Sequence, residues 1–166
     1  INSQNKKFLS KNFDKNKLII LPNTTINFSK FFNKKILNTK NQLINIKNNN
    51  KNILYVGRIE ETKGIISLLE SLSTIKDLRF NLILVGKNNL NNKTLKKYEN
   101  LPVYFYDEVK VEKLRDFYSI ADIFVFPSFE DTWGMVINEV FSYDCVVICS
   151  KNAGCYPDLA NEENSL

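Results

Sequence analysis

The sequence contains no histidine and only three cysteines, and both shortages limit its chemistry. Cys145, Cys149 and Cys155 form no CxxC pair, and without histidine partners they match none of the usual zinc sites, so we expect no metal. An odd number of cysteines without secretory features also argues against a disulfide framework. Because Cys145 and Cys149 lie in or beside an apolar run, we expect them to be buried as small hydrophobic side chains.

Glycine is also scarce, at five residues in 166, and the usual glycine-rich motifs are missing. The sequence has no GxGxxG dinucleotide-binding loop and no GxxxxGK[ST] phosphate-binding loop. Ser128 lies in no GxSxG motif, and there is no histidine to activate it. These absences weigh against a dehydrogenase and against a hydrolase.

Long apolar runs are missing as well, since none approaches the roughly 18–20 residues of a transmembrane helix. The first residues are polar and form no signal peptide, so we expect a cytoplasmic protein. The chain opens on Ile1 rather than methionine, and we expect it to be a piece of a longer protein. A length of 166 residues with 43% hydrophobic composition allows one domain with a proper core.

Positive charge is concentrated early in the chain. Residues 1–50 contain ten lysines and one acid, a net charge of +9, whereas residues 51–166 contain 13 basic and 17 acidic side chains, a net charge of −4. The lysines are mixed with asparagine and isoleucine and form no helical stripe, so we expect a solvated linker and no nucleic-acid partner. Peripheral contact with the inner face of a membrane stays open as an alternative.

Short apolar runs alternate with helical patterns along the chain. The predicted strands are Lys17–Leu21, Ile53–Val56, Phe80–Val85, Val103–Tyr106, Asp122–Phe126 and Val146–Cys149. Apolar residues recur at helical spacing in 65–72, 111–121 and 136–141. Nearly continuous apolar strands separated by helices predict an α/β fold with an open, doubly wound parallel sheet.

We expect the domain to span residues 17–166, with 1–16 as a helix or linker tail and an irregular, asparagine-rich stretch over 22–52. In open α/β sheets, ligands bind beyond the carboxyl ends of the strands. The predicted strands end at Gly57-Arg58, Gly86-Lys87-Asn88, Asp107-Glu108-Val109 and Pro127–Asp131. The candidate binding residues therefore belong to one rim of the sheet.

The first candidate motif runs from Gly57 to Gly64. Gly57 lets a ligand approach the backbone closely, and Arg58 offers a planar donor fork suited to phosphate oxygens. Lys63 adds a point charge just before a helix, whose free N–H groups also favour anions. Such charges stabilise a departing diphosphate. The alternative is that both cations pair with Glu60 and Glu61 as surface ions.

The second candidate motif surrounds the start of a helix. Asp131 or Thr132 is predicted to be the N-cap, and the N–H groups near Gly134–Val136 can then bind a phosphate. Glu139 can reach a ribose diol, and Asp131 can accept hydrogen bonds from a sugar. The alternative is a capped amphipathic helix with one exposed acid. Together, the two motifs favour a nucleoside diphosphate sugar as the ligand.

Several segments in order resemble a known family. They are Lys17–Asn23, Ile53–Arg58, Lys63-Gly64, Leu82–Gly86 and Ala121–Ser128. In this order they are similar to the second Rossmann-like domain of the GT-B glycosyltransferases, in particular to the retaining enzymes of glycosyltransferase family 4, also called the glycosyl transferases group 1 domain. The similarity runs from about Lys17 to the end of the chain.

The resemblance implies roles for individual residues. It implies that Arg58 and Lys63 contact the donor diphosphate and that Asp131 contacts the donor sugar, all three acting in catalysis. Glu139 would hold the ribose. The other donor-binding residues that it implies are Gly57, Gly86, Val109, Gly134, Met135 and Val136. The family's first acid is usually glutamate, whereas this sequence has Asp131, with Glu130 as the alternative.

By the same resemblance, the whole enzyme transfers a sugar from a nucleotide donor to an acceptor hydroxyl, with retention and without an essential metal or other cofactor. The acceptor, a glycan or lipid-linked glycan, would bind to an N-terminal domain that the chain lacks, so the chain alone should bind donor weakly. The expected process is cell-surface polysaccharide or glycolipid synthesis. The alternatives are a non-catalytic nucleotide-binding module and a GT-B-like sugar-nucleotide epimerase.

Overall fold

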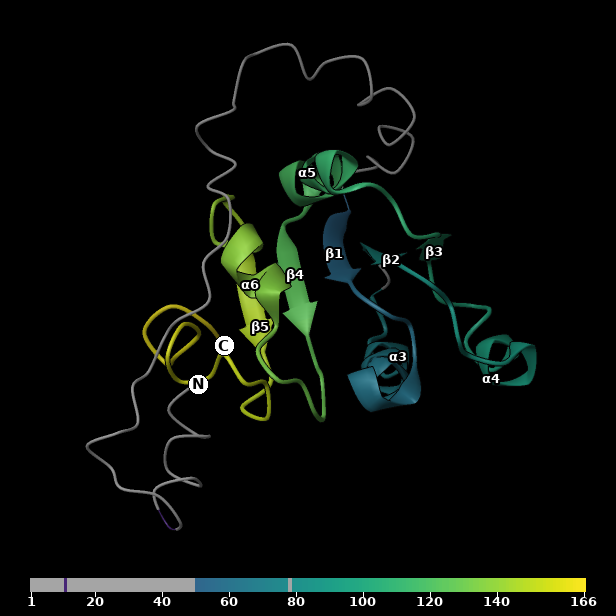
Figure 1. The fold of residues 1–166 in the computed structure, drawn as a ribbon. Coiled ribbons are helices and arrows are strands. Elements are labelled where there is room, and N and C mark those ends of the chain that lie inside the picture. Colours follow the sequence, from purple (N-terminus) through teal and green to yellow (C-terminus); the bar gives the residue numbers. More distant parts are fainter. Residues whose placement is uncertain (1–10, 12–49, 78) are drawn as a thin grey trace.

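The structure is a computed structural model that describes Lys11, residues 50–77 and residues 79–166. Within this part of the chain, five parallel strands form one sheet in the order β3-β2-β1-β4-β5 (Figure 1). The strands are β1 (Lys51–Val56), β2 (Phe80–Val85), β3 (Val103–Tyr106), β4 (Ile123–Phe126) and β5 (Val146–Cys149). Five predicted strands are thereby confirmed. The predicted strand Lys17–Leu21, the tail over 1–16 and most of the stretch 22–52 lie outside the described residues.

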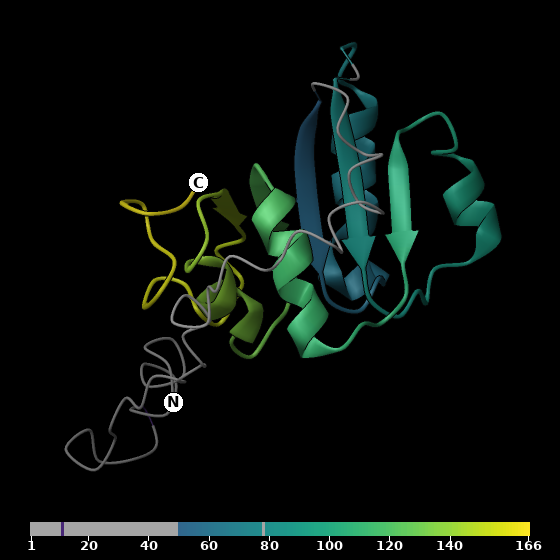
Figure 2. The same ribbon diagram turned by 90° about the horizontal axis from the view of Figure 1, so that it is seen from above.

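Helices cover both faces of this sheet. They are α3 (Ile65–Ser73), α4 (Asn92–Lys96), α5 (Val111–Ile120) and α6 (Met135–Val140), with the short 3-10 helix η4 (Glu61–Lys63) before α3. Helix α3 lies on one face and α5 on the other, as a doubly wound sheet requires (Figures 1 and 2). Hydrophobic spacing did not predict α4, whose one apolar residue is Leu95. Within the described residues, every helix is too short or too polar to span a bilayer.

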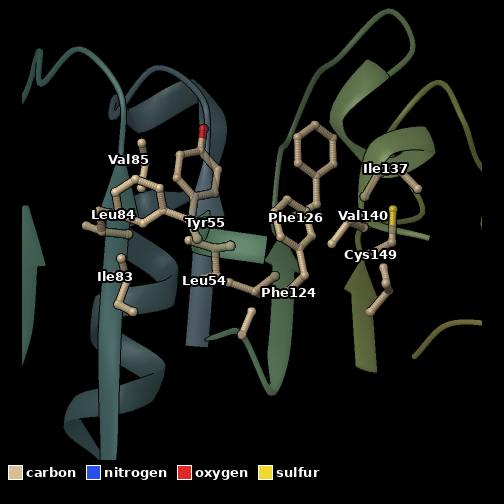
Figure 3. Packing of buried hydrophobic residues seen from close by; sticks show 14 of the residues in the cluster. Leu54, Tyr55, Ile83, Leu84, Val85, Phe124, Phe126, Ile137, Val140 and Cys149 are labelled. Carbon is tan, nitrogen blue, oxygen red and sulfur yellow. The ribbon is translucent and has the colours of Figure 1, made fainter. Parts of the chain in front are cut away.

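The core forms around the central strands. Every residue of β2 is buried, which explains its nearly continuous apolar sequence. Leu54 and Tyr55 of β1 and Phe124 of β4 pack nearby with no exposed surface (Figure 3). Cys149 is buried, as predicted, whereas Cys145 is only half-buried.

The neighbouring strands β1 and β4 define where a ligand can enter. Ile53 pairs with Ile123 and Leu54 with Phe124, so the carboxyl ends of the two strands lie side by side. After β1 the chain turns toward α3, and after β4 it turns toward α6, which a hydrogen bond joins to α5. Because the two connections leave toward opposite faces, a crevice opens between them at the carboxyl end of the sheet.

Candidate functional site

An open cleft of about 680 Å³ lies at this switch point between β1 and β4. Eight of the ten sequence-predicted binding residues line it: Gly57, Arg58, Lys63, Asp131, Gly134, Met135, Val136 and Glu139. Tyr55, Leu114, Tyr118 and Phe126 also line the cleft and were not predicted to do so. The cleft therefore combines charged groups from two loops with an aromatic and aliphatic wall.

Lys63 connects the two loops that border the cleft. It is the last residue of η4, and its Nζ donates hydrogen bonds to Asp131 Oδ2 at 2.8 Å and to the Glu130 carbonyl at 3.1 Å. The Lys63 and Asp131 side chains are only 15% and 19% exposed, so this ion pair is weakly screened by water. A cation and a carboxylate thus occupy the centre of the rim together.

Asp131 uses both carboxylate oxygens within the protein. Oδ2 pairs with Lys63, and Oδ1 accepts a hydrogen bond from the Trp133 backbone N–H at 3.2 Å. The prediction that Asp131 or Thr132 caps the helix is wrong. The N-cap of α6 is Gly134, with φ of 86° and no side-chain cap bond, because the Asp131 carboxylate folds back on Trp133 before the helix begins.

Arg58 stands at the outer side of the cleft, with a side chain that is 64% exposed. Its Nη2 lies 3.2 Å from Glu60 Oε1. For Arg58, the structure therefore contains the ion pair with Glu60 that we gave as the alternative to a phosphate contact. The pKa of Glu60 is lowered, most of all by the hydrogen bond from the Thr62 hydroxyl and less by the Asn89 amide and the charge of Arg58. Lys63, in contrast, pairs with Asp131 instead of the nearby glutamates.

The buried Tyr55 side chain fixes the backbone carbonyl of Arg58. The Tyr55 hydroxyl donates to the Arg58 carbonyl at 2.8 Å, and burial raises the pKa of Tyr55, so this hydroxyl stays protonated. A Cβ at Gly57 would lie 2.8 Å from the same hydroxyl. Gly57 therefore fits this turn because it leaves room for the tyrosine.

Two further glycines bring the loops close to each other. Gly64 has φ of 71°, and a Cβ there would clash with the Pro127 carbonyl of the loop after β4. A Cβ at Gly86 would clash with the Gly57 carbonyl, so Gly86 supports the β1 loop from the side of β2. Neither Gly86 nor the half-buried Val109 is among the residues that line the cleft, and their contact with a nucleotide stays a prediction.

Glu139 faces the cleft from α6 and is held from α5. Its Oε2 accepts a hydrogen bond from the Tyr118 hydroxyl at 2.7 Å. The pKa of Tyr118 is raised mainly by burial and secondly by the charge of Glu139. The tyrosine therefore stays neutral and donates its hydroxyl proton to the hydrogen bond. No sequence pattern revealed this contact, because the two residues belong to different helices.

The arrangement is suited to a ligand with both anionic and hydroxyl groups. Arg58 and Lys63 can bind phosphate oxygens, and the first N–H groups of α6 lack partners within the helix. Carboxylates at Glu130, Asp131 and Glu139 can accept hydrogen bonds from hydroxyls. The fold and site thus define a Rossmann-like domain with a polar ligand crevice at its switch point.

Comparison with known proteins identifies the family. The model for glycosyl transferases group 1 matches residues 38–165, and the chain belongs to this family. The resemblance noted in the sequence is thereby confirmed. The chain is also 30% identical over 127 residues to the lipopolysaccharide 1,2-N-acetylglucosaminetransferase of Salmonella typhimurium, covering 68% of this chain and 33% of that protein.

Solved structures share the fold. The crystal structure of WaaG, a glycosyltransferase involved in lipopolysaccharide biosynthesis, matches with a TM-score of 0.80 at 20% identity, covering 100% of this chain and 47% of that chain. The crystal structure of the Anabaena protein HepE in complex with UDP and glucose matches with a TM-score of 0.58 at 21% identity. The match covers 80% of this chain and 35% of that chain. The chain therefore spans between a third and a half of the length of these relatives.

Proposed function

We propose that this chain is the donor-binding domain of a retaining glycosyltransferase, which transfers a sugar from a nucleoside diphosphate sugar to an acceptor hydroxyl. The observation that carries the proposal is that two cations and two carboxylates meet in one cleft at the switch point of a group 1 domain. The cations are Arg58 and Lys63, and the carboxylates belong to Asp131 and Glu139. Binding of UDP and glucose by a protein with the same fold supports this choice of ligand.

The cations act on the leaving group. As the bond between sugar and diphosphate breaks, negative charge grows on the diphosphate oxygens, and positive groups aimed at them lower the barrier. Lys63 lies at the rim of the cleft, where its Nζ donates hydrogen bonds to the Glu130 carbonyl and to Asp131. Arg58 is more exposed and has a guanidinium fork that matches two phosphate oxygens. When the donor binds, the diphosphate becomes a third partner for Lys63, beside the Glu130 carbonyl and Asp131.

The carboxylates act on the hydroxyls of the donor. Glu139 accepts from the ribose diol, while Asp131, or Glu130 beside it, accepts from the transferred sugar. The backbone N–H groups at Gly134, Met135 and Val136 contact the phosphate or sugar, and Gly57, Gly86 and Val109 shape the nucleotide side of the site. These roles follow the resemblance to the family, and for the residues that line the cleft, which exclude Gly86 and Val109, their shared location supports them.

The remaining parts of the proposal concern the whole protein. The acceptor is a glycan or lipid-linked glycan bound by a second domain, and the process is cell-surface polysaccharide or glycolipid synthesis on the cytoplasmic side of a membrane. The lipopolysaccharide enzyme to which this chain is similar supports this choice of process. The resemblance to the family also supports the part of the proposal that the transfer needs no essential metal.

Calorimetric titration of the chain with UDP, GDP and ADP tests the proposal. We expect one of them to bind with a Kd of about 1 mM or tighter, which corresponds to about −4 kcal/mol or more. The matching nucleotide sugar should also show saturation transfer to its sugar protons, which a module that reads only the nucleotide would not produce. If none of the three nucleotides binds at millimolar concentration, the proposal is wrong.

A further inference from the structure

The Tyr118 hydroxyl is directed at the cleft carboxylate of Glu139 across the gap between α5 and α6. The hydroxyl donates to Glu139 Oε2 at 2.7 Å, a short distance typical of a bond to a charged acceptor. Both side chains line the cleft at the switch point. The contact therefore links helix α5 to Glu139, a residue of α6 that lines the cleft.

The tyrosine ring has little freedom to move. Tyr118 is 2% exposed and packs edge-on against Phe124 of β4, with ring centroids 6.2 Å apart. The ring of Tyr143 also packs against it, tilted by 44°, with ring centroids 5.2 Å apart. A donor fixed in this way by the core can impose its own position on a flexible partner.

Glu139 is such a partner. A glutamate side chain has three rotatable bonds, and a ligand that orders it loses binding free energy to side-chain entropy. The bond from Tyr118 orders the carboxylate before any ligand arrives. It uses Oε2, and among the described residues none donates a hydrogen bond to Oε1, whose acceptor positions can serve a ligand.

We propose that Tyr118 is a positioning residue that orients Glu139 for the hydroxyls of a nucleotide ribose. The inference rests on the proposed function, because it takes Glu139 as the ribose ligand. Its consequence concerns specificity: the site should prefer a ribonucleotide to its deoxy forms, and the Tyr118 hydroxyl should be responsible for much of that preference.

The test compares the affinity of the full chain for a ribonucleotide and its deoxy forms. The probes are UDP, GDP and ADP, and then the 2′-deoxy and 3′-deoxy forms of the one that binds most tightly. For the unaltered chain we expect the loss of a ribose hydroxyl to weaken binding about tenfold, which is typical of a polar site left unpaired. Tyr118→Phe should reduce this preference to about twofold or less, and should weaken the ribonucleotide more than the deoxy form.

A matched control is available in the same chain. The Tyr98 hydroxyl donates to Glu70 at 3.4 Å, outside the cleft, so Tyr98→Phe makes the same substitution at a tyrosine–glutamate contact that is longer and more exposed. This variant should keep the full preference for the ribonucleotide. Tyr118→Phe keeps the ring that packs in the core, and its melting temperature should fall by no more than about 5 °C. A purely structural role would lower stability without changing the ratio of the two affinities.

The possible outcomes are distinct. If the unaltered chain binds none of the nucleotides, the proposed function fails and this inference fails with it. If the chain binds one of them but does not distinguish ribose from deoxyribose, or if Tyr118→Phe distinguishes them as well as the unaltered chain does, the inference is overturned while the proposed function stands.

Discussion

Lys63 and Asp131 lie 68 positions apart in the sequence, yet the Lys63 Nζ is 2.8 Å from Asp131 Oδ2. Lys63 ends η4 after β1, and Asp131 belongs to the loop after β4. The ion pair therefore joins the two loops that border the cleft at the switch point of the sheet. A phosphate that enters the cleft meets a cation already neutralised by a carboxylate. The balance between these two charges should therefore govern both loop stability and anion affinity.

The first prediction concerns stability. Lys63→Met and Asp131→Asn should each lower the free energy of unfolding, because each leaves the other group mostly buried without its charged partner. In a double-mutant cycle measured by urea unfolding, we expect a coupling energy of about 1–2 kcal/mol. The exposed pair Lys151–Glu162, at 3.1 Å, is the control and should couple by less than about 0.5 kcal/mol. Equal coupling in both pairs would show that burial adds nothing to the Lys63 contact.

The second prediction concerns anion binding. Asp131→Asn should bind UDP about threefold more tightly than the unaltered chain, because it frees Lys63 from a competing carboxylate. Lys63→Met should weaken the same binding about tenfold. Calorimetry measures both, and Asp144→Asn, an exposed acid outside the cleft, controls for the change in net charge. Weaker UDP binding by Asp131→Asn would mean that the carboxylate holds Lys63 in place for the phosphate.

The third prediction separates binding from stability at Arg58. In its ion pair with Glu60 the Arg58 side chain is 64% exposed, and Glu60 also accepts hydrogen bonds from Thr62 and Asn89. Arg58→Gln should therefore change the free energy of unfolding by less than about 0.5 kcal/mol. The same substitution should weaken UDP binding about tenfold if the guanidinium contacts the diphosphate. Arg79→Gln breaks the exposed pair with Asp77 outside the cleft and should leave binding unchanged. Unchanged UDP affinity in Arg58→Gln would remove this residue from the site.

The sequence predicted the sheet well because buried parallel strands have a strong local signature. The strand Phe80–Val85 is apolar at five of its six positions and is buried throughout, and its predicted bounds match β2. The convergence of the two charged motifs also followed from sequence, since residues after parallel strands must reach the same rim. The resemblance to group 1 glycosyltransferases added the identity of the domain.

The finer contacts of the site could not be predicted, because they depend on side-chain pairing between distant segments. Nothing in the sequence joins Tyr118 to Glu139, or shows that Asp131 turns back on Trp133. The buried asparagines give another example. Asn81 donates to Asn52 Oδ1 at 2.9 Å across β2 and β1, satisfying polar groups that hydrophobic patterning would assign to the surface.

The fourth prediction concerns the close approach of the two loops at Gly64. This residue has φ of 71°, which disfavours any residue with a Cβ, and the added methyl of Gly64→Ala would clash with the Pro127 carbonyl. We expect the free energy of unfolding to fall by about 2–4 kcal/mol, from backbone strain together with displacement of the loop after β4. Since Lys63 precedes this glycine, UDP binding should weaken as well. Ser71→Ala, at an exposed position of α3, should stay within about 0.5 kcal/mol in the same urea titration. A loss below about 1 kcal/mol in Gly64→Ala would mean that the two loops can separate at little cost, and that the cleft does not depend on their contact at this point.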